Sequence, residues 1–184
     1  MTSVLSPEVE VIDKQTIRFQ RLLPGPVERV WAYLTEPEKR ARWFAGGPME
    51  LREGGKATLF FQHKNLVQPG ETAPEKYRQA MEGMAFDTLV TRCEPPHVLA
   101  FLFGEDQPDV QDRSEVTFEL KSQGDKVLLT LTQRRLPSRE EMRGVSGGWH
   151  LHLIMLQHVL EGTKPPRFWD THAELEAKYA RLIP

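Results

Sequence analysis

The sequence has few of the features that place a protein outside the cytoplasm. Its 184 residues include one cysteine, Cys93, which excludes an internal disulfide and a zinc site built from cysteines. No apolar run approaches the roughly 20 residues that span a bilayer. The N-terminus shows no basic segment followed by an apolar one, so we expect no signal peptide. These absences together predict a soluble cytoplasmic protein.

An excess of charge of one sign is also missing. Lysine and arginine total 24 against 26 acidic residues, which argues against wholesale binding to nucleic acid or to an anionic membrane. The acidic stretch 104–112 lacks the ligand spacing and the central glycine of a calcium loop. No glycine-rich loop leads from a strand into a helix, so the sequence predicts no nucleotide site and no cofactor.

The most informative segment is a long, mostly apolar helix expected over residues 147–162. Two glycines open it, and a glycine followed by Thr-Lys-Pro-Pro ends it. Only a narrow arc with His150, Gln157 and Glu161 suits water, so the helix should be mostly buried. At 100° per residue the apolar stripe contains Trp149, Leu153, Leu156 and Leu160.

Strand-like segments separated by turns fill most of the chain before this helix. The pair at 116–120 and 127–131 alternates most cleanly and predicts a hairpin. Two short helices, 27–35 and 37–44, follow the first strand, and the second has capping-box spacing at its start. The expected strands are 11–23, 49–52, 56–63, 79–93, 98–103, 116–120 and 127–131.

The connections and the chain ends complete the expected organisation. The loop 64–78 is long enough for a lid or a partner contact, and 136–144 is a polar connection into the long helix. A last helix starts near Thr171, and its apolar stripe should dock on the domain or on a second subunit. We expect three parts: an arm at 1–10, one domain at 11–163 and a C-terminal helical extension at 164–184.

Antiparallel strands with one solvated face need cover on the other face, and the long apolar helix is the obvious cover. The pattern therefore predicts an α+β fold in which a curved antiparallel sheet of about seven strands wraps around the C-terminal helix.

Three blocks, in this order, resemble one protein family. Residues 23–44 begin Leu-Pro-Gly-Pro-Val-Glu-Arg-Val-Trp and end Arg-Trp-Phe, residues 93–99 read Cys-Glu-Pro-Pro-His-Val-Leu, and residues 147–153 read Gly-Gly-Trp-His-Leu-His-Leu. They resemble START-like helix-grip domains of the SRPBCC superfamily, in the branch of homologues of the activator of the heat-shock-protein-90 ATPase. The resemblance covers about 17–162. Relatives often carry Thr-His where this chain has Thr132-Gln133.

The resemblance implies a helix-grip fold with a cavity between the long helix and the concave sheet. It does not imply one activity, because such folds serve as lipid and polyketide binders, cyclases and co-chaperone domains. We expect a cavity on the order of 300 Å³ or more, which a ligand would enter near the loops 45–48, 64–78 and 104–112. The expected ligand-binding residues are Trp43, Phe44, Phe86, Phe101, Trp149, His152, Met155 and Leu156.

His152 is the one polar residue inside the apolar arc of the long helix, and two interpretations stay open. A neutral imidazole beside a cavity can orient a ligand carbonyl or hydroxyl, or it can be a core histidine that bonds to the protein itself. His150, His152 and His158 are not spaced by four, so we expect no metal site. Asp87 and Glu82 differ in strand parity, so they form no catalytic pair.

The favoured function is binding of a small apolar ligand, in a regulatory or stress-related role. An enzyme of the cyclase or hydrolase type on the same scaffold is the first alternative, although no motif predicts catalysis. The second alternative is a protein-interaction module, either co-chaperone-like with a chaperone partner or a homodimer.

Overall fold

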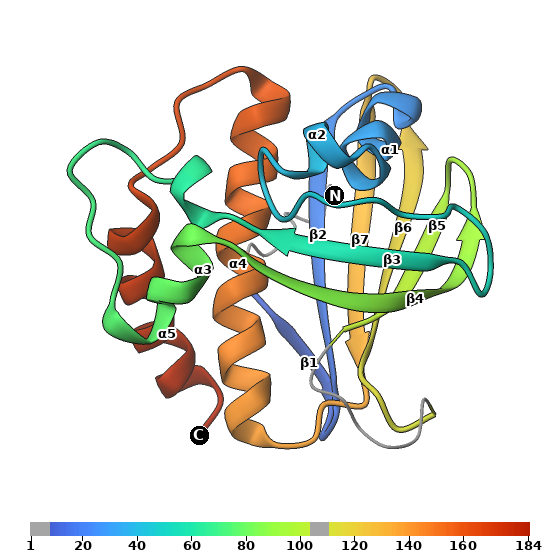
Figure 1. Ribbon diagram of the computed structural model, residues 1–184. Coiled ribbons are helices and arrows are strands. Elements are labelled where there is room, and N and C mark those ends of the chain that lie inside the picture. The colour runs from blue at the N-terminus through green and yellow to red at the C-terminus, as the bar shows by residue number, and fades with distance from the viewer. Residues whose placement is uncertain (1–7, 104–110) are drawn as a thin grey trace.

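The structure, a computed structural model, describes residues 8–103 and 111–184 (Figure 1). Its centre is a seven-stranded antiparallel sheet with the strand order β1-β2-β7-β6-β5-β4-β3. The strands are β1 Glu10–Asp13, β2 Thr16–Pro24, β3 Lys56–Phe61, β4 Met84–Glu94, β5 Val98–Leu102, β6 Glu115–Gln123 and β7 Lys126–Arg134.

Five α-helices and two short 3-10 turns complete the described part of the chain. The α-helices are α1 Val27–Thr35, α2 Pro37–Arg40, α3 Arg78–Glu82, α4 Arg139–Glu161 and α5 Phe168–Leu182. The 3-10 turns are His63–Asn65 and Glu75–Tyr77. None of the helices within 8–103 and 111–184 has the length and hydropathy required to cross a membrane.

The helix-grip architecture predicted from the pattern is confirmed. The long helix α4 packs against β2 of the sheet on one side and against α5 on another, as Figure 1 shows. The predicted hairpin is present as β6 and β7, with Phe118 opposite Leu131 and a turn at Gly124, whose φ is +64°. On both strands the apolar side chains alternate toward the core, which is what places them under the helix.

Several boundaries differ from those expected, and three of the differences have a visible local cause. The single strand expected at 11–23 is a hairpin of β1 and β2, because the Asp13 carboxylate accepts a hydrogen bond from the Gln15 backbone N–H and turns the chain. The strand expected at 79–93 starts only at Met84. Its first residues form α3, and Gly83 (φ +146°) follows, with the Phe60 ring 2.9 Å from where a Cβ would lie.

The third difference is the start of α4, which lies at Arg139 rather than in the glycine pair. The stretch 136–144 was expected to be a polar connection, but its second half is helical. Ser138 caps the helix, because its Oγ accepts a 3.0 Å hydrogen bond from the Glu141 N–H. Similarly, α5 starts at Phe168 rather than near Thr171.

One buried cation organises the segment between α1 and β3. The Arg40 side chain is 1% exposed and faces backbone carbonyls rather than a carboxylate. It donates to the carbonyl oxygens of Thr35, Ala45, Gly46 and Gly47 at 2.6–3.2 Å. Burial lowers the pKa of Arg40 to about 10, so the guanidinium remains charged at neutral pH. The five-donor fork therefore fixes the path of the chain that leads into the core.

Replacing Arg40 with lysine tests this role. Arg40→Lys keeps the charge but has three donors on one nitrogen in place of the five donors of the guanidinium. It cannot reach all four carbonyl groups, so some of them lose their hydrogen bond. We expect the free energy of unfolding in urea to fall by about 3 kcal/mol. The matched control is Arg18→Lys at the exposed pair with Glu10, where we expect a loss below about 1 kcal/mol. Equal losses at the two sites would contradict the assignment.

Candidate functional site

A pocket of about 220 Å³ lies between α4 and the β3–β4 end of the sheet. Residues 63–83, which we call the cover segment, close it on one side, and Figure 1 shows α3 of this segment beside the middle of α4. The pocket exists where expected, but its volume is below the 300 Å³ expected from the sequence. Its lining residues are Phe44, Phe61, His63, Tyr77, Ala80, Met84, Phe86, Phe103, Val145, Gly148, Trp149 and His152.

Aromatic rings form most of the pocket wall and pack on one another. The Phe44 ring lies 4.9 Å from that of Trp149 and 5.0 Å from that of Phe61. Phe86 contacts Phe61 at 5.2 Å and is 40% exposed, so it stands at the mouth. Rings that support one another in this way cannot easily collapse into the space beside them. The wall is therefore apolar and stiff.

Gly148 leaves the space on the helix side. A Cβ built at this residue would have no heavy atom within 4 Å, although Trp149 beside it is 2% exposed. Glycine inside a helix costs about 1 kcal/mol relative to alanine. In exchange, the missing side chain at Gly148 leaves open space beside the middle of α4.

A chain of buried hydrogen bonds fixes the Trp149 ring. Its Nε1–H donates to Gln133 Oε1 at 2.7 Å, and Gln133 Nε2 donates to Ser114 Oγ at 2.8 Å. Ser114 Oγ in turn donates to the Arg134 carbonyl at 2.9 Å. The Gln133 amide accepts and donates at the same time. This residue thus orients the pocket wall without touching the pocket.

His152 points its two nitrogens in different chemical directions. Nδ1 lies 2.7 Å from the Trp43 carbonyl oxygen, which can only accept, so Nδ1 carries the proton and Nε2 is an acceptor. Among the described residues no partner of Nε2 is found. The pKa of His152 is lowered to about 3, mainly by burial and to a smaller extent by the neighbouring His63. One nitrogen of His152 thus bonds to the protein, as in a core histidine, and the ring also lines the pocket.

His63 is the second imidazole of the wall, and its ring centroid lies 5.7 Å from that of His152. Neither His63 nitrogen has a hydrogen-bond partner among the described residues, although both are enclosed. The pKa of His63 is lowered to about 4, mainly by burial and to a smaller extent by His172. Both imidazoles are therefore neutral at physiological pH, and no charged side chain lines the pocket in the described part of the chain.

The eight expected ligand-binding residues divide into two groups. Phe44, Phe86, Trp149 and His152 line the pocket. The other four lie in the packed core outside it, with exposures of 0–2%: Trp43, Phe101, Met155 and Leu156. Trp43 shows why, because its Nε1–H donates to the Tyr33 carbonyl and its ring packs on Phe118 at 6.2 Å.

Sequence reasoning missed the residues that come from the cover segment and from the sheet edge. Phe61 and His63 continue the alternation that starts at Leu59, so strand parity could have found them. Tyr77 and Ala80 carry no such signal, because they belong to a loop and a short helix whose position is set only by the folded chain.

The cover segment is held in place by α5. Tyr77 stacks on Trp169 at 5.4 Å, and the Trp169 backbone N–H donates to the Glu71 carboxylate at 2.7 Å. Gln68 donates to the Pro165 carbonyl at 2.8 Å, and Lys76 pairs with Glu176. The last helix therefore contacts the segment that closes the pocket, and the acidic loop expected beside it lies mostly outside the described residues.

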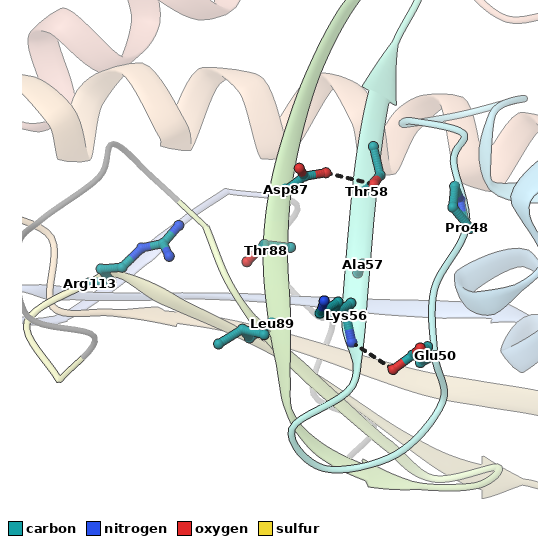
Figure 2. Close-up of a pocket in the computed structure, with 9 residues that line it drawn as sticks. All are labelled: Pro48, Glu50, Lys56, Ala57, Thr58, Asp87, Thr88, Leu89 and Arg113. Atoms are coloured by element: carbon teal, nitrogen blue, oxygen red, sulfur yellow. Dashed lines mark hydrogen bonds between the residues drawn. The ribbon is translucent and has the colours of Figure 1, made fainter.

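A second hollow, of about 530 Å³, lies over β3 and β4 and has charged side chains in its lining (Figure 2). Here Thr58 Oγ1 donates to Asp87 Oδ1 at 2.7 Å, on the face of the strands opposite that of Phe61 and Phe86. Asp87 is exposed, and Glu82 is exposed in α3, so they form no pair in the apolar pocket. Within 8–103 and 111–184, no group of three or more metal-ligating side chains is arranged around a common point.

Comparison with known families gives one match that covers most of the chain. The family described as Activator of Hsp90 ATPase homolog 1-like protein matches residues 24–161, which include every strand from β3 to β7 and the whole of α4. No curated protein matches the sequence.

Solved structures extend the likeness to nearly the full length. A Bordetella parapertussis protein solved by NMR is 44% identical and covers 98% of this chain and 95% of its own, with a TM-score of 0.79. CalU16 from Micromonospora echinospora is 26% identical over 96% of this chain and 94% of its own, with a TM-score of 0.65. DynU16, from the dynemicin biosynthetic locus, is 22% identical over 85% of this chain and 51% of its own, with a TM-score of 0.62, which shows the shared fold.

The pKa values of the buried histidines predict loss of stability in acid. Burial lowers the pKa of His152 to about 3, whereas the unfolded chain has about 6.5. Between these values the unfolded state binds more protons, so stability falls as the pH is lowered. At pH 5 this residue alone costs about 2 kcal/mol relative to pH 7.5. His63 and His150, each with a pKa lowered to about 4, act in the same direction.

His152→Asn tests this, because the asparagine amide can still donate to the Trp43 carbonyl but does not titrate. We expect the difference in free energy of unfolding between pH 7.5 and pH 5 to shrink by about 2 kcal/mol. Urea unfolding at the two pH values measures it. A variant with the same pH dependence as the parent would show that His152 is not held neutral.

Proposed function

The chain belongs to the family of Activator of Hsp90 ATPase homolog 1-like proteins, and on that premise we propose that it binds a small, neutral, apolar ligand in the pocket beside α4. The observation that carries the proposal is the pocket wall itself, which combines tilted and edge-to-face aromatic rings with no charged side chain among the described residues. Burial of apolar ligand surface against such a wall is favourable, and burial of a charged group there is unfavourable because no opposite charge replaces its water.

The size of the pocket sets the size of the ligand. Cavities of about 150 Å³ lined by apolar side chains bind benzene in other proteins. A volume of about 220 Å³ therefore suits one or two fused rings rather than a long lipid chain. The aromatic rings of the wall favour a flat, aromatic occupant, because aromatic pairs add to the free energy of area burial.

The charge state of the histidines supports binding rather than catalysis. Turnover by acid–base chemistry requires a group whose pKa lies near the working pH. The pKa of His152 is lowered to about 3 and that of His63 to about 4, so neither is poised to exchange protons at neutral pH. No carboxylate among the described residues lines the pocket to assist them.

Filling the pocket from the helix side is the direct test. Gly148→Leu adds a side chain where a Cβ meets no atom within 4 Å, so the protein should fold and the pocket should be occupied by leucine. We expect naphthalene to bind the parent protein and to lose at least tenfold in affinity with Gly148→Leu. Ligand-observed NMR or quenching of naphthalene fluorescence measures both.

The matched control is Gly144→Leu. This glycine lies one turn earlier in α4, also has no atom within 4 Å of a Cβ, and does not line the pocket. Its variant should bind naphthalene like the parent, because helix propensity changes equally in both variants. Parent protein that fails to bind naphthalene, or a Gly148→Leu variant that binds as well as Gly144→Leu, would contradict the proposal.

A charged analogue tests the neutrality of the site separately. We expect 2-naphthoate to compete at least a hundredfold more weakly than naphthalene, since the wall has no cation to replace the water around a carboxylate. If 2-naphthoate competed as well as naphthalene at the same concentration, a cation would have to lie near the pocket, and that result would contradict a neutral binding site.

A further inference from the structure

Two neutral imidazoles stand next to each other in the pocket wall, one on the cover segment and one on α4. Their ring centroids are 5.7 Å apart, and both rings also contact Phe168 of α5, at 5.2 Å for His63 and 5.9 Å for His152. The remaining lining residues are almost entirely hydrocarbon, and the indole N–H of Trp149 is already bonded to Gln133. Apart from the Tyr77 hydroxyl, the imidazole pair therefore holds the unbonded polar side-chain atoms of the wall, and an occupant meets the His63 nitrogens only when that ring turns.

Three nitrogens of this pair lack a protein partner among the described residues. His63 contributes Nδ1 and Nε2, which are both enclosed. His152 contributes only Nε2, since its Nδ1–H is bonded to the Trp43 carbonyl, and this Nε2 is not among the enclosed unpaired atoms. Leaving a buried donor or acceptor unpaired costs about 1–3 kcal/mol, and native proteins rarely leave several together. An apolar core could have used phenylalanine here at no such cost.

We propose that the pocket selects neutral ring compounds that carry a hydroxyl group, and that this hydroxyl bridges His152 and His63. The inference rests on the proposed function and adds the chemical class of the ligand. The hydroxyl donates its proton to Nε2 of His152, which can only accept. Its oxygen accepts from the N–H of His63, which is free to carry its proton on either nitrogen.

The spacing of the rings permits this bridge. A hydroxyl oxygen at about 2.8 Å from an imidazole nitrogen lies about 4 Å from that ring's centroid. Two such reaches span about 8 Å, more than the 5.7 Å that separates the rings, so one oxygen can meet both. The His63 nitrogens are enclosed, so the ring must rotate about χ2, a torsion with a broad energy profile.

Other polar groups match the pair less well. An ether or a ketone can accept from His63 but leaves Nε2 of His152 without a donor. A carboxylate or phenolate brings a negative charge to a wall that has no cation, and a hydrocarbon leaves all three nitrogens unpaired. A hydroxyl is the smallest neutral group that both donates and accepts at one atom.

Three naphthalenes that differ at one position test the selection with the full-length protein at pH 7. We expect 2-naphthol to bind about tenfold more tightly than 2-methoxynaphthalene, which keeps the oxygen but not the donor. Naphthalene itself should bind, as the proposed function requires, and more weakly than 2-naphthol. If naphthalene binds but 2-naphthol gains nothing over the ether, the inference fails while the proposed function stands.

Two substitutions locate the selectivity. In His63→Phe an aromatic ring replaces the imidazole and the unpaired nitrogens are removed, so we expect a protein at least as stable as the parent, and its affinity for naphthalene serves as the reference for its other ligands. Its preference for 2-naphthol over 2-methoxynaphthalene should fall to about twofold or less. His152→Asn, which keeps a donor for the Trp43 carbonyl, should lose the same preference.

A merely structural role for His63 predicts the opposite pattern, with lost stability and unchanged selectivity, and that result would overturn the inference. An aromatic cage for cations is the competing chemistry. Phenyltrimethylammonium should therefore bind at least tenfold more weakly than 2-naphthol, and tighter binding of the ammonium would also overturn the inference.

Discussion

A helix that is apolar around most of its circumference has to be covered on every side, and this requirement shapes the protein. The sheet covers one side of α4, and α5 covers another. The arc that was expected to face water is partly closed, because His150 is 6% exposed and its Nδ1 lies 2.7 Å from the Tyr179 hydroxyl of α5. Beside Gly148 the cover segment and the sheet edge approach the helix without filling the space, and the pocket is what remains.

The position of this space depends on polar contacts buried elsewhere. Arg40 holds the carbonyl groups on either side of Phe44, so the first wall residue sits on a segment tied down by a cation. The residue before Phe44 is Trp43. Its carbonyl accepts a hydrogen bond from His152, and its ring packs in the core. One short stretch thus links a buried guanidinium, the sheet and the long helix. The stiffness of the wall follows from these hydrogen bonds as much as from ring packing.

The sequence reveals the architecture well because period and order are local properties that survive in the fold. The alternation in β6 and β7 and the apolar stripe of α4 predicted the sheet and its cover. The start of α4 was predicted wrongly, since the glycine pair was interpreted as a boundary while Ser138 and Glu141 already carried a capping signal. Of the neighbours Trp43 and Phe44, only the second lines the pocket, and the sequence does not say which, since both are large and apolar. Tyr77 and Ala80 were not predicted, because a loop and a short helix show no periodicity from which a facing direction follows.

The family match ends at residue 161, before α5 begins at Phe168. The part of the chain that grips the cover segment, through Trp169 and Glu176, therefore lies outside the signature by which relatives are recognised. Two members of the family can both match over this region and still differ in the contacts that hold the cover segment in place. A change in α5 can thus alter the cover of the pocket while the part of the chain that the family shares stays the same.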